Sequence, residues 1–269
     1  GGLHGAAVQL PYPSVGATEN LLIAAAGTPA ETKITGAAAE PEISDLLAYL
    51  RGCGALIESQ PDGAILVQGR EALTGCCCHA ILPDRIEAAT YLAAAAITGG
   101  EITVYASPEH LAAPLAALRR MGCRITTGEQ SITLTAPEHL QGAGSIVTLP
   151  YPGFPTDLQA IFMALAAAAE GYTAFTETVF PRRWAHVEEL RRLGADITVV
   201  GSHAVIRGAP LIGSALTCTD LRAGAAVVLA ALAAKGESSV TAISHIERGY
   251  ADFVSTLRHL GADIYLTEV

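Results

Sequence analysis

Aromatic residues are scarce in this sequence. They make up 5% of its 269 residues, whereas hydrophobic residues as a whole make up 51%. Alanine, leucine, isoleucine and valine must therefore fill the interior, which favours helices packed closely on sheets. The length suffices for one large domain or two ordinary ones, each with a substantial core.

Positive charge is also in short supply. The chain has 16 lysines and arginines against 26 acidic residues, and its formal net charge is −10. This balance argues against nucleic acid or a membrane surface as a partner. Any anionic ligand must be held by local positive groups, against the overall field.

The six cysteines contain no CxxC pair. Three are consecutive, Cys76, Cys77 and Cys78, and neighbours in a strand point to opposite faces, so they make a poor metal cluster. Reduced thiols in the cytoplasm are the expected state. The opening Gly-Gly-Leu-His-Gly shows no basic region before an apolar run, and alanine-rich stretches such as 92–97 are too short to span a bilayer. A cytoplasmic protein without a membrane partner is therefore predicted.

Two markers recur along the chain at one period. A Leu-x-Gly motif places its glycine at four positions about 70 residues apart, Gly5, Gly75, Gly142 and Gly213. A second marker reads LRGCGALI, RRMGCRI, RRLGADI and RHLGADI, and ends at Ile57, Ile125, Ile197 and Ile264. Because both markers share the period, the sequence predicts four copies of one unit.

Each unit reads as β-α-β-α-β-β. A short strand such as 6–10 precedes an apolar helix, a β-rich run such as 101–105 follows, and an amphipathic helix leads to two strands joined by a turn. The apolar helices are expected at 18–26, 86–98, 157–169 and 221–234, ended by Gly27, Gly99, Gly171 and Gly236. They have almost no polar face and should be buried. The predicted fold is α/β, with sheets outside and helices at the centre.

The fourth unit ends one strand short. Its Gly-Ala-Asp-Ile segment is expected to be a strand, but the counterpart of 64–69 does not follow before Val269. An open sheet edge would favour aggregation. Another segment is therefore expected to supply the strand.

Polar motifs stand at the head of the apolar helices, for example Pro-Asp-Arg at 83–85, Phe-Pro-Thr-Asp at 154–157 and Thr-Asp-Leu-Arg at 219–222. One interpretation is N-capping, worth about 1 kcal/mol for each helix. Capping does not require arginine, however, and Arg85 and Arg222 lie at the positive end of a helix dipole. An anion bound there would explain them.

A second group of cations opens the amphipathic helices. Arg182 and Arg183 follow Glu-Thr-Val-Phe, and Arg248 lies in His-Ile-Glu-Arg-Gly-Tyr. Each could be an ordinary solvated arginine. Their shared place in the repeat favours a function instead.

From about Leu3 to its end, the chain resembles the UDP-N-acetylglucosamine 1-carboxyvinyltransferase family. The resemblance rests on SVGATEN, LPDRIEA, LPYPGFPTDLQA, ETVFxxRxxHVxELRRLGA, TDLRAGAA and HIxRGY. It implies two similar domains, each of three such units around buried parallel helices, the inside-out α/β fold of enolpyruvyl transferases. Residues 1–82 would be one unit of the first domain and 83–269 three units of the second. The family's N-terminal segment completes the second domain, in agreement with the missing strand.

The resemblance also implies a reaction. The enolpyruvyl group of phosphoenolpyruvate would pass to the 3-hydroxyl of UDP-N-acetylglucosamine, the first committed step of peptidoglycan synthesis, with no metal or other cofactor. Asp157 matches the carboxylate that binds this hydroxyl and takes its proton. Arg183, Arg222 and Arg248 match cations around phosphoenolpyruvate and the phosphate it loses, and Asp220 matches an acidic residue that lines the site.

The resemblance also implies which residues contact the sugar nucleotide. Ser14, Val15 and Gly16 match the loop that lines the nucleotide site, and Val179 matches a contact to the sugar. Tyr12 stands where the family often has lysine. The family's Lys-Asn pair and its loop with a reactive cysteine have no match, and the six cysteines are expected to be buried as small hydrophobic residues.

Two alternatives remain open. The first is the sibling enolpyruvyl transferase of the shikimate pathway. The second is a non-catalytic role, as a domain fragment, a degenerate paralogue or an assembly partner. We expect this chain to be inactive by itself. It should be active only when the family's N-terminal segment is present, on a longer polypeptide or on a partner polypeptide.

Overall fold

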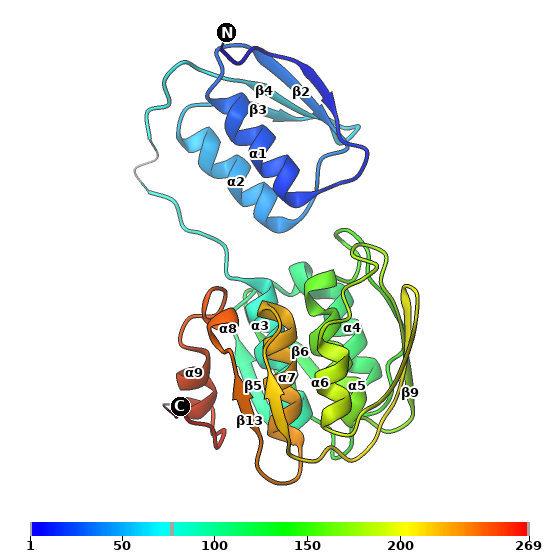
Figure 1. Ribbon diagram of the computed structural model, residues 1–269. Helices are drawn as coiled ribbons and strands as arrows, with labels where there is room; N and C mark the ends of the chain where they lie inside the picture. The colour runs from blue at the N-terminus through cyan, green and yellow to red at the C-terminus, as the bar shows by residue number, and fades with distance from the viewer. Residues whose placement is uncertain (1, 76–77, 268–269) are drawn as a thin grey trace. The chain divides into compact units, whose positions relative to one another are not determined.

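Two sets of helices and strands make up the chain, each around its own hydrophobic core (Figure 1). The computed structural model describes residues 2–75 and 78–267. The first unit comprises residues 1–82 with 150–152, and the second comprises 83–149 with 153–269. No helix in the described ranges is long and apolar enough to cross a membrane.

The first unit contains one copy of the predicted repeat. Its elements are β1 (Ala7–Gln9), α1 (Val15–Ala26), β2 (Glu31–Thr35), α2 (Pro41–Gly52), β3 (Leu56–Ser59) and β4 (Ile65–Gln68). The sheet order is β1-β2-β4-β3. The first two strands are parallel because α1 connects them, and β4 runs antiparallel to both of its neighbours. The last strand of the repeat therefore lies inside the sheet.

The second unit contains the other three copies. The second copy has α3 (Arg85–Thr98), β5 (Glu101–Val104), η1 (Pro108–Leu111), α4 (Ala112–Arg120), β6 (Arg124–Thr127) and β7 (Ile132–Thr135). The third has β8 (Gly144–Val147), η2 (Thr156–Leu158), α5 (Gln159–Ala168), β9 (Tyr172–Thr176), α6 (His186–Arg192), β10 (Asp196–Val200) and β11 (His203–Arg207). The fourth has β12 (Ala215–Thr217), α7 (Leu221–Ala233), β13 (Ser239–Thr241), α8 (Ser244–Glu247) and α9 (Phe253–His259).

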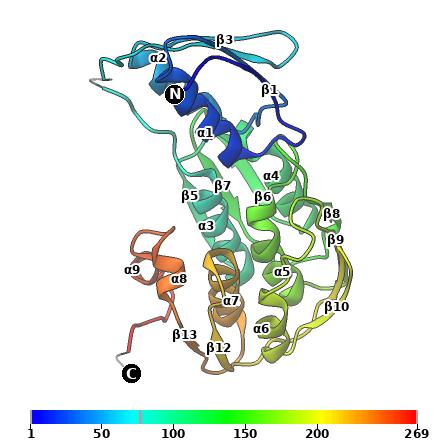
Figure 2. The same ribbon diagram turned by 45° about the horizontal axis from the view of Figure 1, so that its top comes forward.

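The centre of the second unit is helical, as predicted. Helices α3, α5 and α7 contact one another and lie side by side, with the sheets outside them (Figure 1, Figure 2). Every residue of α5 from Gln159 to Ala167 is buried. In the first unit, by contrast, α1 buries only four residues, and Ile23 is 56% exposed. The prediction of burial on all sides was wrong for α1, because within its unit this helix packs only on α2 and one face of the sheet.

The geometry of the backbone explains why both sequence markers contain a glycine. A Cβ atom at Gly5, Gly142 or Gly213 would lie 2.1–2.3 Å from a backbone oxygen at the start of the unit's second, parallel strand or two residues before it. The glycines of the second marker adopt left-handed backbone angles, with φ between +94° and +102°, at Gly54, Gly122, Gly194 and Gly261. Gly75 differs from its counterparts, since nothing lies within 4 Å of a Cβ built there.

Changing Gly142 to alanine is expected to lower the free energy of unfolding of the second unit by about 1–3 kcal/mol, because the strands must move apart. The measurement is urea denaturation followed by the fluorescence of Trp184, the only tryptophan, which lies in that unit. Gly100→Ala is the matched control, since its Cβ would lie 3.7 Å from the nearest atom. Equal midpoints for the two variants would contradict the packing argument.

Several predicted boundaries need correction. Helices α5 and α7 end at Ala168 and Ala233, three residues before the glycines expected to end them, whereas Gly27 and Gly99 do occupy the C-cap. The second copy lacks its first strand among the described residues, since 78–84 run without pairing.

The fourth copy differs most. Its Gly-Ala-Asp-Ile segment was expected to be a strand, but residues 262–267 form none. In the other copies the last strand, β4, β7 or β11, pairs with both the second and the third strand. No described residue supplies that central strand in the fourth copy, so β13 pairs with β12 alone. Residues 262–267 therefore have no strand to pair with.

Most of the cysteines that can be described are buried, as predicted. Cys53, Cys123 and Cys218 are buried, and burial raises the pKa of the Cys123 and Cys218 thiols to about 11, so they stay protonated. The prediction was wrong for Cys78, which is exposed. Cys76 and Cys77 lie outside the described residues.

Candidate functional site

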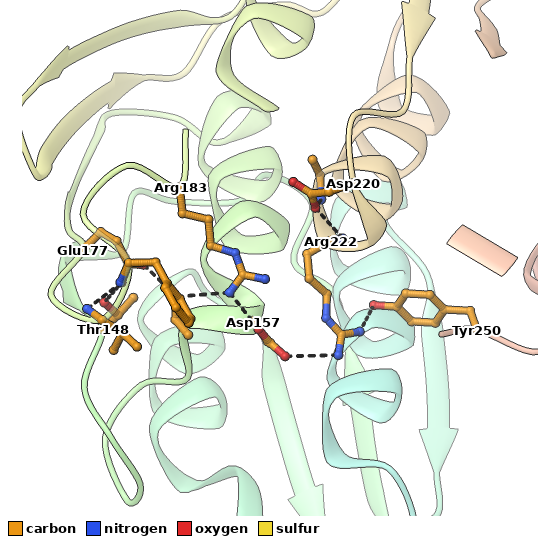
Figure 3. Close-up of polar contacts among 11 residues, drawn as sticks. Thr148, Asp157, Glu177, Arg183, Asp220, Arg222 and Tyr250 are labelled. Carbon is orange, nitrogen blue, oxygen red and sulfur yellow. Dashed lines mark hydrogen bonds and ion pairs between the residues drawn. The ribbon is translucent and has the colours of Figure 1, made fainter. Parts of the chain in front are cut away.

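The aspartates at the helix heads are used in two different ways. Asp84 and Asp220 each accept two hydrogen bonds from backbone N–H groups of the first turn, at 2.7–3.0 Å, and so cap α3 and α7. Asp157 lies in a similar Thr-Asp-Leu motif but makes no capping bond, because the 3-10 turn η2 precedes α5. Its carboxylate is free to point elsewhere, and it faces two arginines (Figure 3).

Asp157 lies between Arg183 and Arg222. Its Oδ1 is 2.7 Å from Nη1 of Arg183, and its Oδ2 is 3.2 Å from Nη2 of Arg222. The carboxylate is 38% exposed, and the arginine side chains are 23% and 13% exposed. Two arginines thus contact one carboxylate in a protein whose net charge is −10. Local cations of this kind are what the composition requires of a site for an anionic ligand.

The charge state of Asp157 follows from this arrangement. Burial raises the pKa of its carboxyl group, but Arg222 and Arg183 lower it by more, so the pKa lies below the usual 3.8. The group is therefore ionised at neutral pH and can accept a proton. It is a weak base while both arginines hold it.

Arg222 is anchored on its other side by a buried tyrosine. Its Nη1 donates to the hydroxyl of Tyr250 at 3.1 Å, and that hydroxyl is 2.9 Å from Oγ1 of Thr90 on α3. Tyr250 is 1% exposed. The sequence reasoning missed both residues as parts of the site. Tyr250 closes the HIxRGY motif and could have been found there, whereas nothing in the sequence marks Thr90.

Arg183 is anchored by a second set of contacts. Its Nη1 also donates to Oγ1 of Thr156 at 3.2 Å, and its guanidinium lies over the ring of Phe180, with Cζ 5.5 Å from the centroid. Thr156 in turn donates to Glu177, a fully buried carboxylate. Val179, the expected sugar contact, donates its backbone N–H to the same carboxylate. Sequence reasoning missed Thr156 and Glu177 as well.

In the described ranges, the other charged residues that were predicted in the second unit make no hydrogen bond to Asp157. Asp220 caps α7, as described above. Arg248, at the end of α8, is exposed, and within residues 2–75 and 78–267 no carboxylate pairs with it. Arg85 is 8% exposed, so it is too deeply buried to offer an open anion site.

The three nucleotide-loop residues belong to the first unit and are described there by themselves. Oγ of Ser14 accepts from the N–H of Ala17 at 3.4 Å and caps α1, whose first two residues are Val15 and Gly16. The interpretation of the polar residues at the helix heads as N-caps is therefore confirmed for Ser14.

His186, in the HVxEL motif next to the site, is a buried neutral base. Its side chain is 1% exposed, and Nε2 lies 3.0 Å from Sδ of Met163. Burial lowers the pKa of the imidazole, Asp220 raises it and Arg183 lowers it again, to a value of about 4 from the usual 6.5.

We expect this histidine to make the second unit acid-sensitive. The folded pKa is depressed, so below pH 6.5 the unfolded chain binds a proton that the folded protein does not. The free energy of unfolding should fall from pH 6.5 to about 4, by on the order of 3 kcal/mol. Urea midpoints read from Trp184 across this range should show a shallower pH dependence for His186→Leu. His203→Gln, at an exposed histidine, should keep the slope of the unchanged protein.

Known proteins of one family are similar to this chain. The sequence profile of the EPSP synthase (3-phosphoshikimate 1-carboxyvinyltransferase) family matches residues 1–257. Curated relatives named UDP-N-acetylglucosamine 1-carboxyvinyltransferase are 48% identical over 97% of this chain in Symbiobacterium thermophilum and 47% identical over 97% in Synechocystis. The chain spans 59% and 60% of the length of these two relatives.

Solved structures show the same fold. The enolpyruvyl transferase NikO from Streptomyces tendae has a TM-score of 0.89 and 28% identity, over 98% of this chain and 66% of that protein. An EPSP synthase from Acinetobacter baumannii has a TM-score of 0.75 and 21% identity, over 99% of this chain and 65% of its own. The prediction of the enolpyruvyl transferase fold is confirmed. The chain belongs to the EPSP synthase (3-phosphoshikimate 1-carboxyvinyltransferase) family.

Proposed function

We propose that the protein containing this chain transfers the enolpyruvyl group of phosphoenolpyruvate to the 3-hydroxyl of UDP-N-acetylglucosamine, in peptidoglycan synthesis. The observation that carries the proposal is the position of Asp157 between Arg183 and Arg222. The names of relatives 46–48% identical support the sugar nucleotide as acceptor rather than 3-phosphoshikimate.

The chemistry needs a base and fixed cations. A proton adds to the methylene carbon of phosphoenolpyruvate, and the sugar oxygen bonds to the neighbouring carbon as Asp157 takes the hydroxyl proton. The tetrahedral adduct then loses a proton from the new methyl group, and the bond to phosphate breaks. Arg183, Arg222 and Arg248 hold the carboxylate and phosphate groups, because guanidinium binds such oxygens in pairs.

The ion pairs of Asp157 also suggest how the base is activated. An arriving anion competes with Asp157 for both guanidinium groups. As the arginines turn to the anion, the pKa of Asp157 rises towards its usual value, since the charges that lowered it are neutralised. Substrate binding thus makes the carboxylate a stronger base.

Further residues and segments complete this proposal. Ser14, Val15 and Gly16 line the nucleotide site, Val179 contacts the sugar, and Asp220 lines the active site. Residues 1–82 form part of a first domain and 83–269 a second. A segment elsewhere in a longer protein, or on a partner chain, pairs with β13 to complete the fourth sheet. The support for this strand is that β13 pairs with β12 alone, and that the chain spans about 60% of its relatives.

The test uses two preparations. One is the 269-residue chain alone, and the other is this chain joined to or co-expressed with the remaining part that its relatives contain. Phosphate release from phosphoenolpyruvate is measured with UDP-N-acetylglucosamine and, separately, with 3-phosphoshikimate. We expect turnover with the sugar nucleotide only, and in the second preparation only. The preparation that turns over is called the active preparation below.

Each other outcome has a definite meaning. Turnover with 3-phosphoshikimate would overturn the proposed acceptor. Turnover by the chain alone would overturn the need for a further segment but not the reaction. Absence of turnover in both preparations would favour the non-catalytic alternative.

A further inference from the structure

We propose that Glu177 is a positioning residue, which acts through the hydroxyl of Thr156 to hold Arg183 in place beside Asp157. The inference rests on the proposed function for its meaning in catalysis. Its structural content stands on the contacts described next and can be tested without turnover.

Glu177 is a carboxylate sealed inside the protein. Its exposed fraction is 0%, and no arginine or lysine in the described ranges forms an ion pair with it. A buried charge of this kind is costly unless hydrogen bonds replace its hydration. Four donors do so, at 2.8–3.0 Å: the hydroxyls of Thr148 and Thr156 and the backbone N–H groups of Val179 and Phe180. These four bonds offset the cost of burial in one orientation of the carboxylate, so the side chain of Glu177 is held in that orientation.

The two carboxylate oxygens have different partners. Oε1 accepts from Thr148, Val179 and Phe180, and Oε2 accepts from Thr156 alone. Figure 3 shows Thr148 beside Glu177. Oε1 therefore shapes the turn that follows β9, whereas Oε2 faces η2, the segment that carries Asp157.

The bond to Oε2 sets the direction of the Thr156 hydroxyl. A hydroxyl has one proton, and Thr156 gives it to Glu177. A lone pair is then left for Nη1 of Arg183, which is 3.2 Å away and can only donate. The same nitrogen donates to Asp157 at 2.7 Å. Reversing the hydroxyl would place two protons against each other and push Arg183 away.

The turn shaped by Oε1 acts on Arg183 from another side. The N–H of Phe180 is bound to Glu177, and the Phe180 ring lies against the guanidinium of Arg183. One buried carboxylate therefore constrains the arginine twice, through a hydroxyl and through an aromatic ring.

The Glu177→Gln variant distinguishes the positioning of Arg183 from a purely structural role of Glu177. Two backbone N–H groups can only donate, so the amide oxygen must face Val179 and Phe180, and the turn survives. The amide NH2 then faces Thr156, whose hydroxyl must accept from it. The hydroxyl proton has then lost its acceptor on residue 177, so that bond no longer fixes the direction of the hydroxyl and its contact with Arg183 is weakened.

The first experiment follows the guanidinium of Arg183 by side-chain ¹⁵N NMR in the 269-residue chain, with Arg183→Lys used for assignment. The measured quantity is the exchange rate of its Nη protons with water. We expect exchange about 10-fold faster in Glu177→Gln and Thr156→Val, and unchanged exchange in Thr156→Ser, which keeps the hydroxyl. Glu189→Gln is the matched control, because Glu189 is also a buried glutamate bound to a backbone N–H, that of Thr217 at 2.8 Å.

The second experiment measures kcat and KM in the active preparation. Glu177→Gln and Thr156→Val should lower kcat by about 10–100-fold, as a small misplacement of a catalytic group does, and Thr156→Ser should restore it. The inference is overturned if Glu177→Gln leaves the Arg183 exchange rate unchanged, if Glu189→Gln changes it equally, or if Thr156→Ser behaves as Thr156→Val. If the exchange rates respond as expected while no preparation turns over, the positioning holds and the proposed function is wrong.

Discussion

Replacing Asp157 with asparagine is expected to lower kcat of the active preparation by about 10²–10⁴-fold, the range that a general base supplies. The amide has nearly the same shape but cannot take the hydroxyl proton. Affinity for inorganic phosphate should remain or increase, because the carboxylate no longer competes for Arg183 and Arg222. The measurements are steady-state kinetics and calorimetric titration with phosphate.

The control for this variant is Asp196→Asn, at an exposed aspartate that opens β10. It should change kcat by no more than about 2-fold, as expected for a surface site far from the chemistry. A loss of both turnover and phosphate binding in Asp157→Asn would show that Asp157 only supports the fold of the site. Full turnover would exclude it as the base.

Replacing Arg222 with lysine is expected to reduce kcat/KM by about 10²–10³-fold, even though the charge is kept. Nη1 of Arg222 binds the hydroxyl of Tyr250 and Nη2 binds Asp157, so the planar group bridges two partners in fixed directions. A lysine ammonium is a single point and cannot reproduce this bridge. The same kinetic assay provides the measurement.

Two further variants test whether the effect of Arg222→Lys comes from the specific contacts of Arg222. Tyr250→Phe removes one anchor and keeps the ring, so it should give a smaller loss than Arg222→Lys. Arg207→Lys is the matched control, because Arg207 also lies over a tyrosine ring, that of Tyr172 at 5.9 Å, but on the exposed side of β11. If Arg222→Lys retained full kcat/KM, charge alone would be sufficient at this position.

Much of the fold could be predicted because the repeat depends on local backbone geometry, which the sequence records as glycines. Glycine is required wherever two backbones approach too closely for a Cβ or where φ is positive, so it recurs at fixed places and reveals the period. The fourth unit was mispredicted for the opposite reason. A strand exists only with its neighbours, and the Gly-Ala-Asp-Ile sequence carries no information about whether a partner strand is present.

The site was only partly predictable, and Asp157 shows why. Its Thr-Asp-Leu motif is identical to that around Asp220, yet Asp220 caps its helix and Asp157 binds two arginines. The difference lies in the tertiary surroundings and not in the motif. Glu177 and Tyr250 were missed because their partners lie on other segments, which come together only in the folded chain.

The two separate cores have a consequence for how this protein melts. Among the residues that the structure describes, no buried cluster is common to both units, since one core contains Leu22, Ile34 and Val67 and the other is built around α3, α5 and α7. The units should therefore unfold in separate transitions, and a single Tm would describe neither. In scanning calorimetry the van't Hoff enthalpy should be smaller than the total heat absorbed. Trp184 fluorescence, which reports only the second unit, should follow just one of the two heat-absorption steps.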